Sequence, residues 1–157
     1  MAIATAPTAP EAEGPVGLLA RTTAPLVPYA PTILRVVVGF IYLVYGYNKI
    51  QNPAGFEQML TGLSFPVPVI LSWFVILLEL LGGGALIVGL LVRPIGLLFA
   101  IEMIVSSLTV KLALGIAPEG ATGIELDLAL LAASVVLVIL GAGRASVDWD
   151  VLRRELI

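Results

Sequence analysis

The feature that most constrains this chain is a set of four apolar runs, each close to the length that crosses a membrane. They cover residues 32–49, 67–92, 94–114 and 123–141, and charged or Pro/Gly-rich segments separate them. A helix needs about 20 apolar residues to cross the hydrocarbon core of a bilayer. A charged fraction of 12% and a mean hydropathy of +1.08 also lie outside the range of soluble domains. We therefore expect an all-α integral membrane protein, a bundle of four transmembrane helices.

The remaining segments give the expected domain organisation. Residues 1–31 are rich in Ala, Pro and Thr and predict a flexible N-terminal tail. The membrane domain is expected over 32–143, and a cytoplasmic C-terminal tail over 144–157. The connection after the first run is long enough to hold a short amphipathic helix, at about 54–63, on the membrane surface.

The distribution of cations predicts the orientation. Arg93 and Pro94 mark the tightest break between runs, where we expect a hairpin of two helices. With four spans, both termini and this break share one face of the membrane. That face carries six of the eight cations: Arg21, Arg35, Arg93, Arg144, Arg153 and Arg154. Lys49 and Lys111 lie on the other face. Because cations concentrate on the cytoplasmic side, both termini are predicted to be cytoplasmic.

The residue inventory excludes several kinds of chemistry. The chain has no cysteine and no histidine, which removes thiol exchange, disulfides, imidazole proton relays and metal or haem ligation through these side chains. We predict no metal site and no covalent cofactor. The formal charge of -3 gives no support for nucleic-acid binding. Carboxylates, Lys, Arg and Tyr remain to carry any chemistry.

Small and charged residues share one stripe on each of the first two helices. The first stripe, at spacings of 4, 3, 4 and 3, consists of Arg35, Gly39, Tyr42, Gly46 and Lys49. The second consists of Glu79, Gly82, Gly83, Leu86, Gly89 and Arg93. Since small residues let helix backbones approach closely in lipid, all five glycines are predicted to serve helix packing.

Two acids lie deep within apolar runs, Glu79 near the middle of the second and Glu102 about eight residues into the third. An ionised acid at that depth costs on the order of 2 to 3.5 kcal/mol unless it faces a partner or a water-filled cavity. One interpretation is a structural network, for example Arg35 with Glu79 or Glu102. The other is a ligand or proton site. Glu125 favours the dipole of the fourth helix and could also join Lys49 in a polar cluster.

The chain resembles the DoxX family of small four-helix membrane proteins. The resemblance rests on the order and spacing of several short motifs along about three quarters of the chain. These are "LRVVVGFIYLVYGYNKI" (34–50), Gly55-Phe56, Pro66, "LELLGGGALIVGLLVRP" (78–94), Glu125 and "GAGRASVD" (141–148). Ala142 stands where the family more usually has a proline. Ser146 and Asp148 match the family pattern.

The resemblance implies a redox-associated membrane subunit in a bacterial cytoplasmic membrane. Relatives include a membrane subunit of a thiosulfate:quinone oxidoreductase and a membrane component of a mycobacterial oxidoreductase complex. We expect a subunit without its own electron carrier that anchors partner subunits, contacts membrane lipids and lines a quinone or lipid pocket. The candidates for that pocket are Arg35, Tyr42, Lys49, Glu79, Glu102 and Glu125. Two alternatives remain: a purely structural or assembly subunit, and a small transporter or proton pathway.

Overall fold

The computed structural model of the protein describes residues 15–112, 116 and 123–148, and this part of the chain is helical with no strand. It begins with α1 (Pro15–Thr23), a 3-10 segment η1 (Ala24–Tyr29), α2 (Ala30–Gln51) and α3 (Pro53–Gly62). The next helix comprises α4 (Pro68–Leu77), a π-helical segment η2 (Leu78–Gly82) and α5 (Gly83–Val88). The last elements are α6 (Val92–Ser106), the π-helical segment η3 (Ser107–Lys111) and α7 (Ile124–Leu140).

Three continuous helical segments are long and apolar enough to cross a membrane: Leu19–Gln51, Pro68–Val88 and Val92–Lys111. They correspond to the first three predicted runs. The fourth run forms α7, which is apolar and has 17 residues. The described part of the chain is therefore all-helical, and it has the long apolar helices of a membrane protein. Between the first two spans lies α3, in the loop where the sequence predicts a short helix.

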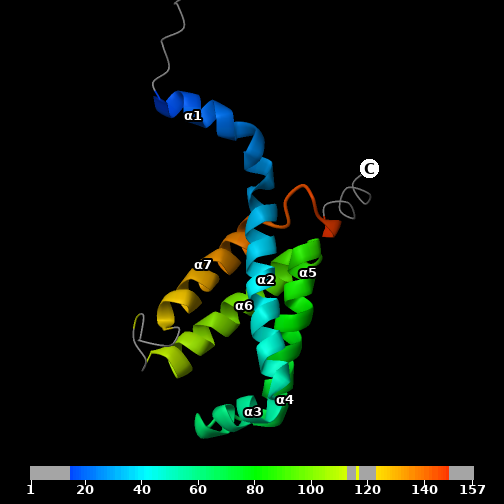
Figure 1. Ribbon diagram of the computed structural model, residues 1–157, viewed down its shortest axis with the longest axis vertical. Coiled ribbons are helices and arrows are strands. Elements are labelled where there is room, and N and C mark those ends of the chain that lie inside the picture. Colours follow the sequence, from blue (N-terminus) through cyan, green and yellow to red (C-terminus); the bar gives the residue numbers. More distant parts are fainter. Residues whose placement is uncertain (1–14, 113–115, 117–122, 149–157) are drawn as a thin grey trace, which may run out of the picture.

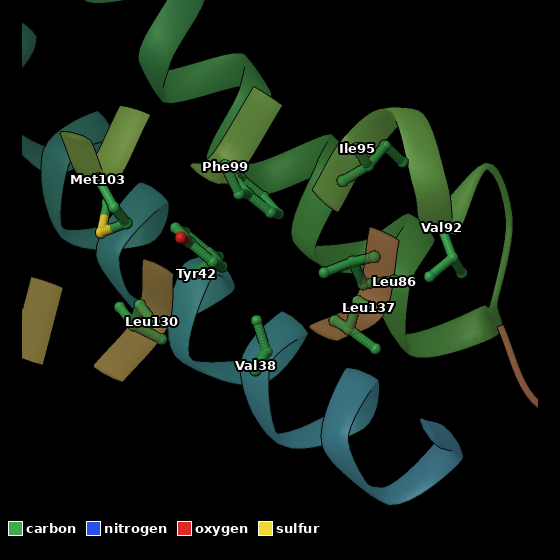
Figure 2. Packing of buried hydrophobic residues seen from close by; sticks show 9 residues of the cluster. All are labelled: Val38, Tyr42, Leu86, Val92, Ile95, Phe99, Met103, Leu130 and Leu137. Atoms are coloured by element: carbon green, nitrogen blue, oxygen red, sulfur yellow. The ribbon is translucent and has the colours of Figure 1, made fainter. Parts of the chain in front are cut away.

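The spans form two helix pairs that cross (Figure 1). α2 packs along η2 and α5, and α6 packs along α7. α6 leaves the short turn after α5 obliquely and packs mainly on α7. The turn predicted near Arg93 and Pro94 is therefore present, but the prediction that the helices on either side of it pack as a hairpin is wrong. The pairs meet in a core that includes Val38, Tyr42, Leu86, Phe99 and Leu137 (Figure 2).

Glycines set the spacing between α2 and its neighbours. A Cβ on Gly39 would lie 2.6 Å from the Gly83 carbonyl oxygen, and one on Gly83 would lie 2.7 Å from the Gly39 carbonyl oxygen. Gly82 faces Phe99 of α6 instead. Gly89 was predicted to pack helices, but it ends α5 with a φ of +78° and lies against Ser146 and Arg35. Its role is in the turn, because only glycine readily adopts that backbone conformation.

The structure corrects both predicted tails. Within the first tail, Pro15–Tyr29 is helical, and it projects away from the bundle as an extension of α2 (Figure 1). Proline favours the first turn of a helix, so a Pro-rich composition does not exclude one. Residues 1–14 and 149–157 of the predicted tails lie outside the described residues.

The segment after α7 packs on the bundle, where a tail was expected from residue 144. The Asp148 carboxylate accepts hydrogen bonds from the backbone N–H groups of Leu91 and Val92, at 2.8 and 2.9 Å. The Asp148 N–H donates to the Gly89 carbonyl at 2.9 Å. These bonds satisfy N–H groups at the beginning of α6 that have no partner within the helix.

Candidate functional site

The candidate site is built around Lys49, whose ammonium group lies between two carboxylates. Lys49 Nζ donates to Glu79 Oε1 at 2.6 Å, and it lies 3.9 Å from Glu102 Oε1. Glu79 is 2% exposed and Glu102 11%, while 23% of the Lys49 side chain remains exposed. The two carboxyl groups also lie beside one another. This cluster joins α2, η2 and α6 through ionic contacts in an otherwise apolar interior.

Local backbone structure brings Glu79 to this position. Glu79 lies in the π-helical turn η2, and single π turns inside α-helices are frequent at functional sites. Gly46 of α2 faces this turn, because a Cβ there would lie 2.9 Å from Leu80 N and 3.0 Å from Glu79 Cβ. The absence of a side chain at Gly46 therefore lets η2 approach α2 and places Glu79 beside Lys49.

A cavity of about 480 Å³ adjoins the ionic cluster. Such a volume lies within the range of small-molecule sites, which are mostly apolar with a few polar groups. α2, α3, α4, α6 and α7 all contribute to the lining, as do η2 and η3. Its apolar lining includes Tyr45, Phe56, Met59, Leu60, Phe65, Leu71, Phe74, Val75, Leu78, Leu98, Ile101, Met103, Val105, Leu126 and Leu130. Its charged lining comprises Lys49, Glu79, Glu102, Lys111 and Asp127.

Tyr42 lies deeper than the ionic cluster. Its ring stacks on Phe99, with 3.5 Å between ring centroids and an interplanar angle of 3°. Its hydroxyl lies beside Ser134 of α7 and within electrostatic reach of Glu79, Glu102 and Asp127. Figure 2 shows Met103 and Leu130 on the hydroxyl side of the ring. The ionic cluster therefore continues inward to two hydroxyl groups.

Several buried polar atoms of this region have no hydrogen-bond partner among the described residues. They are Tyr42 Oη, Glu79 Oε2, Glu102 Oε2, Ser107 Oγ, Asp127 Oδ2 and Ser134 Oγ. A buried polar atom without a partner is costly, and native structures satisfy nearly all such atoms with protein groups, water or ligand. The site thus offers hydrogen-bonding capacity to a bound molecule, to water or to protons shared between the acids.

The structure separates two predicted site residues from the cluster. Arg35 does not pair with Glu79 or Glu102, as the sequence suggested. Its guanidinium donates to the carbonyls of Ala142 (3.0 Å), Leu86 (2.8 Å), Ile87 (2.5 Å) and Ala145. Arg35 lies about four helical turns from Lys49 along α2, which is roughly 21 Å, so it cannot reach the same acids.

Glu125 does not line the cavity, and its carboxylate accepts from the Gly123 N–H at the beginning of α7, at 2.9 Å. Asp127, two residues later, lines the cavity instead. Asp127 and Ser134 were not predicted as site residues. They share a buried stripe with Leu130 and Leu137, and this spacing of 3, 4 and 3 was the available signal.

Comparison with known proteins settles the family. The DoxX family model matches residues 30–112. A protein of Bacillus subtilis (strain 168) named "Putative oxidoreductase CatD" is 34% identical over 116 residues, covering 74% of this chain and 82% of that protein. The chain belongs to the DoxX family. No solved structure matches it.

The DoxX match extends from the beginning of α2 to the end of η3. It therefore includes Lys49, Glu79 and Glu102, and it ends before α7. The ionic cluster is part of the DoxX region itself, whereas Asp127 and Ser134 come from the helix that follows it.

Proposed function

We propose that this DoxX-family protein is a membrane subunit of a quinone-linked redox complex and that its cavity holds the quinone. The observation that carries the proposal is the apolar cavity that ends on Lys49, Glu79 and Glu102. A quinone likewise has a polar part, the two carbonyl oxygens on its ring, and an apolar part, its tail. Such a ligand matches a largely apolar site with a few convergent polar groups.

The charged residues provide both kinds of contact that a quinone head needs. The Lys49 ammonium can donate to a quinone carbonyl oxygen, because it has three N–H donors and, among the described residues, only Glu79 at hydrogen-bond distance. A protonated carboxyl group at Glu79 or Glu102 can donate as well. Phe56, Phe65 and Phe74 offer aromatic surface along the cavity for the ring or the tail. A lipid acyl chain is the alternative occupant of this apolar part.

Electrons must come from another subunit under this proposal. The chain contains no cysteine or histidine with which to ligate a haem or an iron–sulfur cluster. Its role is then to hold the quinone and to anchor the subunit that carries the electrons. The name of the Bacillus subtilis relative, "Putative oxidoreductase CatD", supports the redox association.

The proposal also includes the way in which the helices lie in the membrane. α7 serves as the fourth span, and α3 lies at the interface beside the mouth of the cavity. Six cations on the terminal side support a cytoplasmic location of both termini in a bacterial cell. The cavity then opens toward the outer half of the cytoplasmic membrane.

A structural subunit is the second candidate, and the Arg35 network favours it. All of the described hydrogen bonds of Arg35 go to backbone carbonyls of two segments, Leu86–Ile87 and Ala142–Ala145. Arg35 thus shows that a buried cation of this protein can have a purely structural role, in which it holds two segments together. If Lys49 and its acids do the same, the protein is an assembly subunit whose cavity holds lipid.

Binding of a short-chain quinone to the purified protein tests the two candidates. We expect Glu79→Gln to weaken the binding of decylubiquinone, measured by calorimetry in detergent, by about tenfold or more. The substitution removes the ionic hydrogen bond that positions the Lys49 ammonium toward the quinone, and a hydrogen bond to a charged group contributes about 1.5–3 kcal/mol. Glu57→Gln on α3 is the matched control, because Glu57 is outside the cavity lining. Unchanged binding in Glu79→Gln, with only its stability altered, would favour the structural subunit.

A further inference from the structure

We propose that the cavity is a one-sided vestibule: water, protons and cations reach it only from the membrane face that carries α3 and the beginning of α7, past Asp127 and Lys49. The opposite end is sealed by an apolar plug, which we define as Val38, Leu86 and Leu137. This inference goes beyond the quinone proposal, because it concerns access to the cavity whatever molecule occupies it.

The first observation is the position of the polar atoms. Lys49 lies near the end of α2 and Asp127 in the first turn of α7, and both ends lie at the same side of the bundle as α3 (Figure 1). Glu79 and Glu102 lie farther in, followed by the Tyr42 and Ser134 hydroxyls. Asp127 is within electrostatic reach of both Glu102 and Tyr42. Polar groups therefore extend from the mouth to the middle of the bundle.

The second observation is that these polar groups are incompletely satisfied. Asp127 is 6% exposed, Glu79 2% and Tyr42 1%, yet each has a buried oxygen without a hydrogen-bond partner among the described residues. All three line the cavity. Water molecules that enter the cavity can supply these partners, because a buried water needs two to four polar contacts and this cluster offers them.

The third observation is the apolar plug on the far side of Tyr42. Val38 is 2% exposed, and Leu86 and Leu137 are fully buried. Figure 2 shows these residues on the side of Tyr42 away from Met103 and Leu130. Beyond the plug lies Arg35, whose guanidinium is held by carbonyl groups and cannot lose a proton in a protein. No continuous polar route through the described residues therefore joins Tyr42 to the Arg35 end.

The charges of the vestibule also predict a preference for cations. The groups that face it are Lys49 on α2, Glu79 on η2, Glu102 on α6, Lys111 on η3 and Asp127 on α7, with the hydroxyls of Tyr42 and Tyr45. The three acids of the lining outnumber its two lysines, and low-dielectric walls strengthen the field of such a cluster. Cations and protons should concentrate there, and anions should be excluded.

Cysteine accessibility provides the test, because the natural chain contains no cysteine and any introduced thiol is unique. Ser106→Cys places a thiol in the cavity lining, with Thr109→Cys as a second reporter in the same lining. Ala145→Cys marks the opposite end, beside Arg35. Each variant of the full-length protein is reconstituted into sealed vesicles, and a charged, membrane-impermeant methanethiosulfonate is applied from one face at a time.

We expect the thiols of Ser106→Cys and Thr109→Cys to react from only one face and the thiol of Ala145→Cys to react from only the other. Cavity thiols that react equally from both faces, or from the Ala145 face, would overturn the proposal. Cavity thiols that react from neither face would overturn it as well, since the vestibule would then be closed to water. The vesicles are prepared without quinone, so the labelling result does not depend on whether quinone binds, and failure of this inference is distinguishable from failure of the quinone proposal.

The ratio of rates with cationic and anionic reagents tests the role of Asp127. Normalised to Ala145→Cys, the cationic reagent should modify the cavity thiol at least tenfold faster than the anionic one. Asp127→Asn should reduce this preference several-fold, whereas Glu125→Gln, the same loss of charge at an exposed side chain outside the lining, should change it less. Equal effects of the two substitutions would show that Asp127 does not lie at the mouth of the vestibule.

Discussion

At the scale of single residues, the sequence predicted burial better than it predicted pairing. Glu79 lies in the middle of an apolar run, so its burial in the bundle followed from the cost of exposing a carboxylate to lipid. The cation that pairs with Glu79 could not be predicted from the sequence, because both Arg35 and Lys49 lie on the predicted stripe of α2. The register between α2 and η2 decides which cation meets Glu79, and that register depends on the close contacts at Gly39, Gly46 and Gly83.

Gly83 and Gly84 provide a matched test of this register. Gly83→Ala would place a Cβ 2.7 Å from the Gly39 carbonyl oxygen and 2.9 Å from Leu43 N, whereas a Cβ at Gly84 meets nothing within 4 Å. Overpacking of this kind typically costs about 1–3 kcal/mol. We expect Gly83→Ala to lower the melting temperature in detergent and Gly84→Ala to leave it unchanged or raise it. Equal melting temperatures for the two variants would contradict the close packing of α2 on α5.

Among the elements, the long apolar helices were predictable, whereas α1, η1 and the packing between helices were not. Apolar length identified the three segments that can cross a membrane, because length and hydropathy are local properties. The pairing of α6 with α7, rather than with α5, depends on the path of the turn at Gly89 and Leu91. That path is fixed by residues distant in sequence, since Asp148 and Arg35 both bind this region.

Removal of the Asp148 carboxylate should weaken the beginning of α6. Asp148→Ala loses both hydrogen bonds to the N–H groups of Leu91 and Val92, and substitutions of helix caps typically cost about 0.5–2 kcal/mol. Asp148→Asn keeps one acceptor oxygen and should cost less. Thermal unfolding in detergent should therefore rank the natural protein above the Asn variant and the Asn variant above the Ala variant. A melting temperature of the Ala variant equal to that of the natural protein would refute this role.

Arg35 should hold the segment after α7 against the bundle. Arg35→Lys keeps the positive charge, but a single ammonium nitrogen cannot reach the carbonyls of Leu86, Ala142 and Ala145 together. We expect faster amide hydrogen exchange in residues 141–148 of this variant. Arg144→Lys, an exposed change within the same segment, is the control and should leave exchange unchanged. Unaltered exchange in Arg35→Lys would mean that the segment is held by Asp148 alone.

At the scale of the whole molecule, the two crossed helix pairs produce the cavity. Helical periodicity indicated which face of α2 and of the second span is buried, yet the space between the pairs follows from their crossing, which periodicity does not encode. Sequence patterns therefore identified three of the residues at the site, Lys49, Glu79 and Glu102, as pocket candidates. The structure added Asp127 and Ser134, because their place at the site depends on the position of α7. The contribution of Glu125 was overestimated because its carboxylate binds the beginning of its own helix.

The orientation of the molecule is testable with reporter fusions. The excess of cations on the terminal side predicts a cytoplasmic C-terminus, so a green fluorescent protein fused after Ile157 should fluoresce in a bacterial host. Alkaline phosphatase fused after Gly62, at the end of α3, should be active because the proposed orientation puts that loop outside the cell. Inactive phosphatase after Gly62, together with a dark C-terminal fusion, would reverse the proposed orientation and place the mouth of the cavity at the cytoplasmic face.

Native mass spectrometry of the protein extracted gently from its own membrane is the decisive test of whether the cavity holds a quinone. We expect a bound quinone on the natural protein and on Glu57→Gln, and the loss of that mass in Glu79→Gln with any partner subunits retained. The contrary result is a natural protein that carries partner subunits or phospholipid but no quinone. That result would make Lys49, Glu79 and Glu102 a structural network and the protein an assembly subunit.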